Sequence, residues 1–131
     1  MKYLTIGIPK EVFPGEKRVS IVPKLIPKLL AVGFDVIVEQ GAGNDAGYLD
    51  SEYIRSGAKV VSYQELYEKT DILIKIRPPQ IDPIRNYHET QMYTEIKFLI
   101  SYIYPRTNTD LIERLTKLKQ ISVIGCDCVP R

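Results

Sequence analysis

The chain has 131 residues, of which 44% are hydrophobic and 26% charged, and its net charge is +2 at pH 7. These values are typical of one soluble globular domain, and we expect 1–131 to form a single unit. The small net charge argues against nucleic-acid binding. No apolar run reaches the ~18 residues of a membrane span, so direct membrane insertion is not expected.

Six short runs rich in β-branched residues predict strands. Most are continuously apolar rather than alternating, which indicates strands buried on both faces of a sheet. The run at the N-terminus is interpreted as a strand and not a signal peptide, because charge follows it at once and no small-residue cleavage site is present. The predicted strands are 3–8, 35–39, 59–61, 71–76, 97–103 and 121–127.

Four amphipathic segments between these runs predict helices. Ser62 and Glu65 form a Ser-x-x-Glu capping pattern, and Gly33 and Gly57 are typical C-terminal stops. Pro27 is unfavourable inside a helix, so regular helix is expected to begin only there in the first segment. The predicted helices are 23–33, 49–58, 62–70 and 108–120.

The alternation of strands and helices predicts the fold class. It favours a three-layer α/β/α domain with a mostly parallel, doubly wound sheet of about six strands, of the flavodoxin-like or Rossmann-like kind. The longest irregular stretch, 77–95, contains three prolines, and we expect one short helix near 82–87.

Arginines follow three of the predicted strands. Arg18 comes after the first, Arg77 after the fourth and Arg131 after the sixth. Ligands of open parallel sheets bind beyond the carboxyl ends of the strands, so we expect the three guanidinium groups along one rim. Together they favour a carboxylate or phosphate ligand, whereas each taken alone is equally explained as a solvated surface residue. Other polar residues at strand ends are Lys10, Glu11, Lys17, Ser101, Tyr102, Tyr104 and Asp127.

Lys75 and His88 are single titratable residues in unusual contexts. Lys75 lies inside the apolar run "ILIKI", where a lysine either reaches a ligand at the end of the sheet or is paired in the interior. Both alternatives stay open. His88 lies in the proline-rich loop with no carboxylate at fixed spacing, and we expect a surface histidine rather than a general base.

Two further patterns argue against a cofactor or metal site. "EQGAGNDAG" (39–47) follows a strand, but its G-x-G-x-x-x-G spacing is one residue too long for a dinucleotide loop, so a flexible connection is expected. Cys126 and Cys128 lie two residues apart on a predicted strand, and a disulfide between them would require distortion of the backbone. With one histidine in the chain, we expect structural thiols and no metal.

Several motifs in order along the chain identify a resemblance. "IGIPKE", "GEKRVSIVP", "GFDVIVEQGAG", "DILIKIRPP" and "CDCVPR" resemble the N-terminal domain shared by alanine dehydrogenase and the α subunit of proton-translocating NAD(P) transhydrogenase. The segment "LISYIYPRTNTDLIERL" is more similar to the transhydrogenase branch, in which Ser-aromatic-Ile-aromatic-Pro follows the fifth strand.

The resemblance implies roles for particular residues. Arg18 matches the arginine that binds the substrate carboxylate in alanine dehydrogenase. Arg77 stands where that enzyme has its substrate-binding lysine, and Ser101 where it has its catalytic histidine. These two departures argue against alanine oxidation, because an arginine does not perform a lysine's proton chemistry at neutral pH.

The strand-end positions and the resemblance together give the set of candidate residues. Lys75 matches a lysine of both branches, and Arg131 matches an arginine beside the nicotinamide end of NAD(H). No catalytic residue and no metal ligand are expected. The candidate cofactor-binding residues are Arg131 and Asp127, and the candidate residues of the substrate cleft are Arg18, Lys75, Arg77, Ser101 and Tyr102.

The activity implied is hydride transfer from NADH to NADP⁺, coupled to proton translocation. The chain would form one wall of the NAD(H) cleft and bind NAD only with a dinucleotide-binding domain, which we expect to be missing here, so that the fragment alone is inactive. The implied partners are that domain, the membrane and NADP-binding subunits, and a second copy in a homodimer, at the cytoplasmic face of an inner membrane. The alternatives are an amino-acid dehydrogenase of the alanine dehydrogenase type and a non-catalytic binding module.

Overall fold

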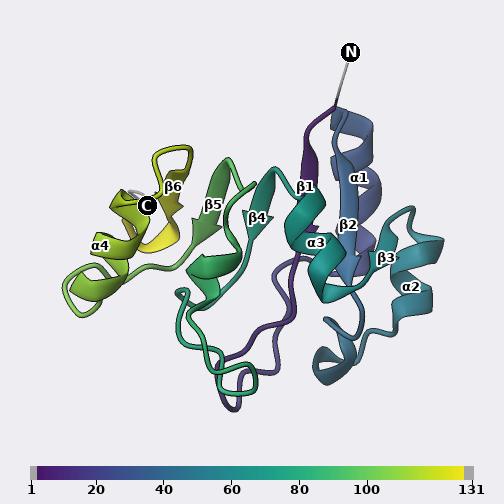
Figure 1. Cartoon of the computed structure of the whole chain (residues 1–131). Coiled ribbons are helices and arrows are strands. Elements are labelled where there is room, and N and C mark those ends of the chain that lie inside the picture. Colours follow the sequence, from purple (N-terminus) through teal and green to yellow (C-terminus); the bar gives the residue numbers. More distant parts are fainter. Residues whose placement is uncertain (1–2, 129–131) are drawn as a thin grey trace.

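The computed structural model describes residues 3–128 and shows one six-stranded sheet (Figure 1). The strands lie in the order β3-β2-β1-β4-β5-β6, and every neighbouring pair is parallel. This order is that of the Rossmann fold, so the predicted α/β class is confirmed. The strands are β1 (Thr5–Ile8), β2 (Asp35–Glu39), β3 (Lys59–Val61), β4 (Ile72–Ile74), β5 (Phe98–Ser101) and β6 (Ser122–Gly125).

The four predicted helices form, each somewhat shorter than expected. Ser62 accepts a hydrogen bond from the Glu65 N–H over 3.2 Å, which confirms the predicted cap. Gly33 ends the first helix with φ +111°, the left-handed conformation that favours glycine. Pro27 lies in the first turn, where a missing N–H is tolerated, after a 3₁₀ turn, η1 (Pro23–Leu25). The helices are α1 (Ile26–Val32), α2 (Asp50–Arg55), α3 (Tyr63–Lys69) and α4 (Thr109–Thr116).

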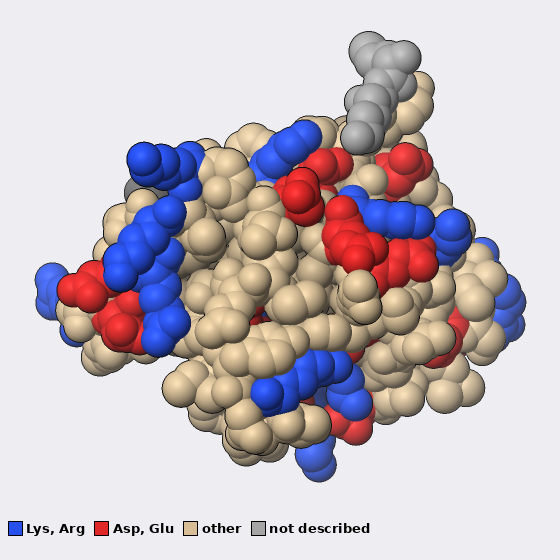
Figure 2. All heavy atoms as spheres, viewed as in Figure 1, with Lys and Arg blue, Asp and Glu red and all other residues tan. Residues whose placement is uncertain are grey.

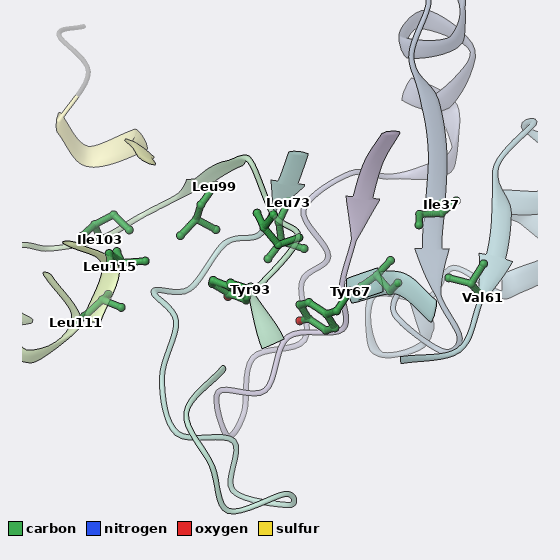
Figure 3. Packing of buried hydrophobic residues seen from close by; sticks show 11 residues of the cluster. Ile37, Val61, Tyr67, Leu73, Tyr93, Leu99, Ile103, Leu111 and Leu115 are labelled. Atoms are coloured by element: carbon green, nitrogen blue, oxygen red, sulfur yellow. The ribbon is translucent and has the colours of Figure 1, made fainter. Parts of the chain in front are cut away.

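The helices divide between the two faces of the sheet. Ile26 of α1 and Tyr53 of α2 pack on one face against β1 and β2. Residues of α3 and α4 pack on the other face with Leu73 and Leu99, as Figure 3 shows. Right-handed crossovers require this division, because the chain moves outward in one direction from β1 to β3 and in the other from β4 to β6.

One part of the sheet is covered on a single face. Leu99 is fully buried beneath the α4 side, whereas Phe98 and Ile124, on the opposite face, are exposed at 38% and 46%. Ile124 shares that face with Ile100, its partner in the register of β5 and β6. The β4–β6 half of the sheet is therefore less completely covered by helices than the β1–β3 half.

The loop 77–95 does not contain the helix expected near 82–87. Asp82 Oδ1 accepts hydrogen bonds from Ile84 N at 2.9 Å and Arg85 N at 3.2 Å, which stabilises a turn instead. Asn86 has φ +61°, which ends the turn. A 3₁₀ helix, η3 (Glu89–Met92), follows later in the loop.

The end of the described chain also differs from the prediction. β6 stops at Gly125, and Cys126–Cys128 form the 3₁₀ turn η4 rather than a strand. The Asp127 carboxylate accepts hydrogen bonds from the backbone of the loop after β5. These contacts hold the end of the chain against that loop, so the strand does not continue. Both cysteines are free thiols. Across residues 3–128, no helix is long and apolar enough to cross a bilayer.

Candidate functional site at the carboxyl edge of the sheet

β1 and β4 are parallel neighbours at which the strand order reverses, since β2 and β3 are added on one side of β1 and β5 and β6 on the far side of β4. The connections that leave their carboxyl ends diverge there, and ligands of doubly wound folds bind in the resulting crevice. The segment after β1 carries Glu11, Glu16 and Arg18, and the segment after β4 carries Lys75 and Arg77. The predicted site residues of these two strands therefore meet at one place.

Glu11 joins the two segments. Its carboxylate accepts hydrogen bonds from Ile76 N at 2.9 Å and Arg77 N at 3.0 Å, and it lies 3.3 Å from Lys75 Nζ. A charged acceptor strengthens such bonds, so Glu11 fixes the backbone that precedes the Arg77 side chain.

Lys75 is buried and paired. Its side chain has no exposed area, and Nζ lies 3.6 Å from Glu89 Oε2 in addition to its contact with Glu11. Nζ also donates to the carbonyl oxygen of Arg77. The structure thus gives Lys75 the partnered role that the sequence left open, and a direct role toward a ligand stays a prediction.

Glu89 is the second carboxylate of this buried cluster. Burial raises its pKa, and Lys75 lowers it in part. Its Oε1 atom has no hydrogen-bond partner within the described chain. Burial therefore opposes a negative charge on Glu89, and the nearby Lys75 favours it.

Arg18 and Arg77 meet on one carboxylate, that of Glu16. Glu16 Oε1 lies 2.7 Å from Arg18 Nη2 and 2.8 Å from Arg77 Nε. The two arginines lower the pKa of Glu16 to about 2, with the hydrogen bond from Arg18 as the largest cause. Glu16 was not among the predicted site residues. The run "GEKR" contained it, but nothing in its spacing showed that a residue 61 positions away would share it.

Ser101 and Tyr102 extend the site to β5. Ser101 is fully buried, and its Oγ lies 3.0 Å from the carbonyl oxygens of both Arg77 and Tyr102. It therefore ties together the loops after β4 and β5. The ring of Tyr102 is exposed and stacks on that of Tyr104, with centroids 5.9 Å apart.

Asp127 lies at the β5–β6 end of the same edge. Its two carboxylate oxygens accept hydrogen bonds of 2.9 Å from Ile103 N and Tyr104 N, and the first of these is the main reason why its pKa is lowered. Arg131 lies outside the described residues, so the expected rim of three guanidinium groups is found for Arg18 and Arg77 alone. A pocket of about 390 Å³ beside Asp127 is lined by Tyr104, Pro105, Arg106, Thr107, Asp127 and Cys128.

His88 is not the surface residue that we expected. It is only 6% exposed, and its Nδ1 accepts the N–H of Thr90 over 3.2 Å at the start of η3. Burial lowers its pKa, which favours the neutral ring needed for this cap. The prediction was wrong because a histidine can cap a 3₁₀ turn, a role that spacing alone did not suggest.

The glycine segment 39–47 forms a turn whose backbone N–H groups are hydrogen-bonded within the protein. Gly41 N donates to Asp50 Oδ1 over 2.9 Å. A Cβ atom on Gly43 would lie 2.8 Å from the ring of Tyr53, so this glycine permits close packing. Within the described part of the chain, no group of His, Cys, Asp and Glu residues could hold a metal ion.

The face of the molecule drawn in Figure 2 carries acidic and basic side chains interspersed among wide uncharged areas. On this face the charges form no broad basic surface, in line with the net charge of +2.

Fold and site together define a Rossmann-like α/β domain with paired arginines at the switch point of its sheet. The family model described as "Alanine dehydrogenase/PNT, N-terminal domain" matches residues 7–131, and the chain belongs to this family. It is 35% identical over 98% of its length to NAD(P) transhydrogenase subunit alpha of Haemophilus influenzae. It is 36% identical to NAD(P) transhydrogenase subunit alpha of Cereibacter sphaeroides, again over 98% of the chain. Alanine dehydrogenase 1 of Staphylococcus aureus is 27% identical over 93% of the chain.

Solved structures agree with this membership. The transhydrogenase from Sinorhizobium meliloti superposes with a TM-score of 0.84 at 28% identity, over 97% of this chain and 36% of that one. An L-alanine dehydrogenase superposes with a TM-score of 0.81 at 28% identity, over 93% of this chain and 32% of that one. Among the sequence relatives, the chain spans 23% of each of the two transhydrogenase subunits and 31% of the alanine dehydrogenase.

Proposed function

We propose that this chain acts as the N-terminal domain of an NAD(P) transhydrogenase α subunit and forms one wall of an NAD(H) cleft. The observation that carries the proposal is the meeting of Arg18 and Arg77 at the switch point between β1 and β4. The resemblance of the loop after β5 to the transhydrogenase branch supports the choice within the family.

Hydride transfer between NADH and NADP⁺ requires orientation rather than acid–base groups from this domain. The nicotinamide supplies the chemistry, and the protein holds the ring and excludes water. The candidate residues fit this task, because Ser101 and Lys75 are buried and bonded, while Arg18 and Tyr102 are exposed at the same edge. A dinucleotide-binding domain would supply the phosphate-binding loop, and NADP-binding and membrane subunits would couple the transfer to proton movement. We place the complex, as a dimer, at the cytoplasmic face of an inner membrane.

The alternative within the family is alanine oxidation. Arg18 could bind a substrate carboxylate, but the position of the alanine dehydrogenase histidine is occupied by Ser101, whose hydroxyl lies 3.0 Å from two carbonyl oxygens. A serine held in this way is a poor proton relay at neutral pH.

The test is a chimera in which this chain replaces the matched segment of the Haemophilus influenzae α subunit, assembled with its partner subunits. We expect NADH-dependent reduction of an NADP⁺ analogue and no NAD⁺ reduction with alanine. Alanine-dependent NAD⁺ reduction would contradict the proposal and support the dehydrogenase alternative. A folded chimera that binds no NADH would instead favour a non-catalytic module.

A further inference from the structure

A tight turn brings two side chains onto Arg77. In the sequence Phe13-Pro14-Gly15-Glu16, the Glu16 N–H donates to the Phe13 carbonyl over 3.0 Å, and Gly15 has φ +85°. Proline followed by a glycine with positive φ is typical of a type II turn. The turn places the Phe13 ring 4.1 Å below the Arg77 guanidinium and the Glu16 carboxylate 2.8 Å from its Nε.

The same carboxylate holds Arg18 through two parallel hydrogen bonds. Arg18 Nε donates to Glu16 Oε2 over 3.0 Å, and Arg18 Nη2 donates to Oε1 over 2.7 Å. Bidentate contacts of this kind fix the plane of a guanidinium group. The Glu16 side chain is only 4% exposed, so the carboxylate faces the arginines rather than the solvent.

Both arginines have N–H groups that are not used in binding Glu16. Their side chains are 64% exposed for Arg18 and 36% for Arg77. Between residues 3 and 128, no acceptor is bonded to Arg77 Nη1 or Nη2, nor to Arg18 Nη1. Two guanidinium charges and one carboxylate charge leave this group with a net charge of one positive unit.

We propose that Glu16 is a positioning residue that holds Arg18 and Arg77 together as one pair of hydrogen-bond donors. Its negative charge leaves the pair with a net charge of one positive unit, which suits a singly charged oxyanion, a carboxylate or a phosphodiester. The proposal rests on the proposed function in placing the pair in the ligand cleft, but it does not require the ligand to be a dinucleotide. Without Glu16 the arginines would carry two uncompensated charges and turn independently, which favours doubly charged anions and weakens bidentate recognition.

The positioning can be measured directly by NMR of the arginine Nε–H groups in the 131-residue chain. R18K and R77K assign the two signals. We expect both Nε–H protons to be protected from solvent exchange in the wild type, and both to lose protection in E16Q. The matched control is D110N, which removes a similar 3.0 Å contact between Arg114 Nε and an exposed carboxylate, and should affect Arg114 alone.

The milder variant E16D guards against a failure of E16Q to fold. An aspartate is one methylene shorter, so at least one of the two Nε–H groups should lose its protection. Unchanged protection of both arginines in a folded Glu16 variant would overturn the positioning role. This result is independent of NADH, so the proposed function could fail while the role of Glu16 stands.

The preference for singly charged anions is tested by adding acetate, dimethyl phosphate or sulfate and following the Nε–H signals of Arg18 and Arg77. In the wild type we expect at least one of the two monoanions, acetate or dimethyl phosphate, to shift both signals. Whichever of them binds more tightly shows whether the pair suits a carboxylate or a phosphodiester. In E16Q, the affinity for that monoanion relative to sulfate should fall about tenfold, because a bidentate contact is lost and one negative charge is removed. An unchanged ratio, or no monoanion-dependent shift in the wild type, would overturn the charge-matching role.

Discussion

At the level of single residues, the carboxyl edge is organised by carboxylates that each serve several partners. Glu11 binds the backbone after β4 and the ammonium of Lys75, Glu16 binds two guanidinium groups, and Asp127 binds two amides of the loop after β5. Each of them accepts hydrogen bonds from residues distant in the sequence. The candidate ligand residues Lys75 and Arg77 are therefore held by Glu11, and Arg18 and Arg77 by Glu16.

Lys75 provides a prediction about stability. K75M removes the only cation in contact with the buried carboxylates of Glu11 and Glu89 among the described residues, so the free energy of unfolding should fall by about 3–5 kcal/mol. Urea denaturation at pH 7 measures this loss. The control K69M breaks an exposed pair with Glu65 and should cost less than about 0.5 kcal/mol. Similar losses in the two variants would show that the buried cluster is not a stabilising unit.

Glu16 provides a prediction about pH. Its pKa of about 2 lies below the ordinary value of 4.5, so its contribution to stability is present above pH 4.5 and is lost as the pH falls toward 2. A carboxyl-detected NMR titration should give that low pKa in the wild type. In R18A the pKa should rise toward 4.5, because the largest cause of the shift is removed, whereas R114A should leave it unchanged. A wild-type value near 4.5 would show that the two arginines do not share this carboxylate in solution.

At the level of elements, β5 is buried on the α4 side, whereas the edge strand β6 is exposed on both faces, with Val123, the register partner of Leu99, 38% exposed. Leu99 packs fully buried beneath α4, while Ile124 on the opposite face is 46% exposed. Strand residues next to one another thus contribute very differently to the core, although both belong to apolar runs in the sequence.

This difference predicts unequal costs of truncation. L99A should lower the free energy of unfolding by about 2–5 kcal/mol, because it removes buried methyl groups and leaves a cavity. I124A should cost less than about 1 kcal/mol, since a half-exposed side chain loses little burial. Thermal or urea unfolding of the 131-residue chain measures both variants. Equal costs would indicate that the second face of β6 is covered in solution.

At the level of the whole molecule, much of the fold could be predicted because its signals are local. Continuous β-branched runs indicated buried parallel strands, and Ser62 and Gly33 marked helix ends that the structure confirms. The strand ends were less accurate where a side chain ends the pairing, as Asp127 does after β6. The turn at Asp82 was missed for a similar reason, because its side chain replaces helical hydrogen bonds.

The candidate site could be predicted in part. The rule for parallel sheets and the resemblance together indicated Arg18 and Arg77, and the structure brings these two residues together. Glu16 could not be predicted, because its importance depends on a contact across 61 positions. An interior pairing of Lys75 was one of two open alternatives, but its partners Glu11 and Glu89 could not be predicted, because these contacts depend on the tertiary fold.

The proposed function depends above all on the paired arginines facing the nicotinamide cleft of a transhydrogenase. Its sharpest test compares hydride transfer from NADH in the chimeric α subunit with and without the substitutions R18A and R77A, with R114A as the control on α4. We expect the double variant to fold and to lose at least about tenfold in kcat/KM for NADH, equivalent to about 1.4 kcal/mol of lost transition-state binding, while R114A is unchanged. Unchanged kinetics in the folded double variant would contradict the assignment of this edge as a wall of the cleft.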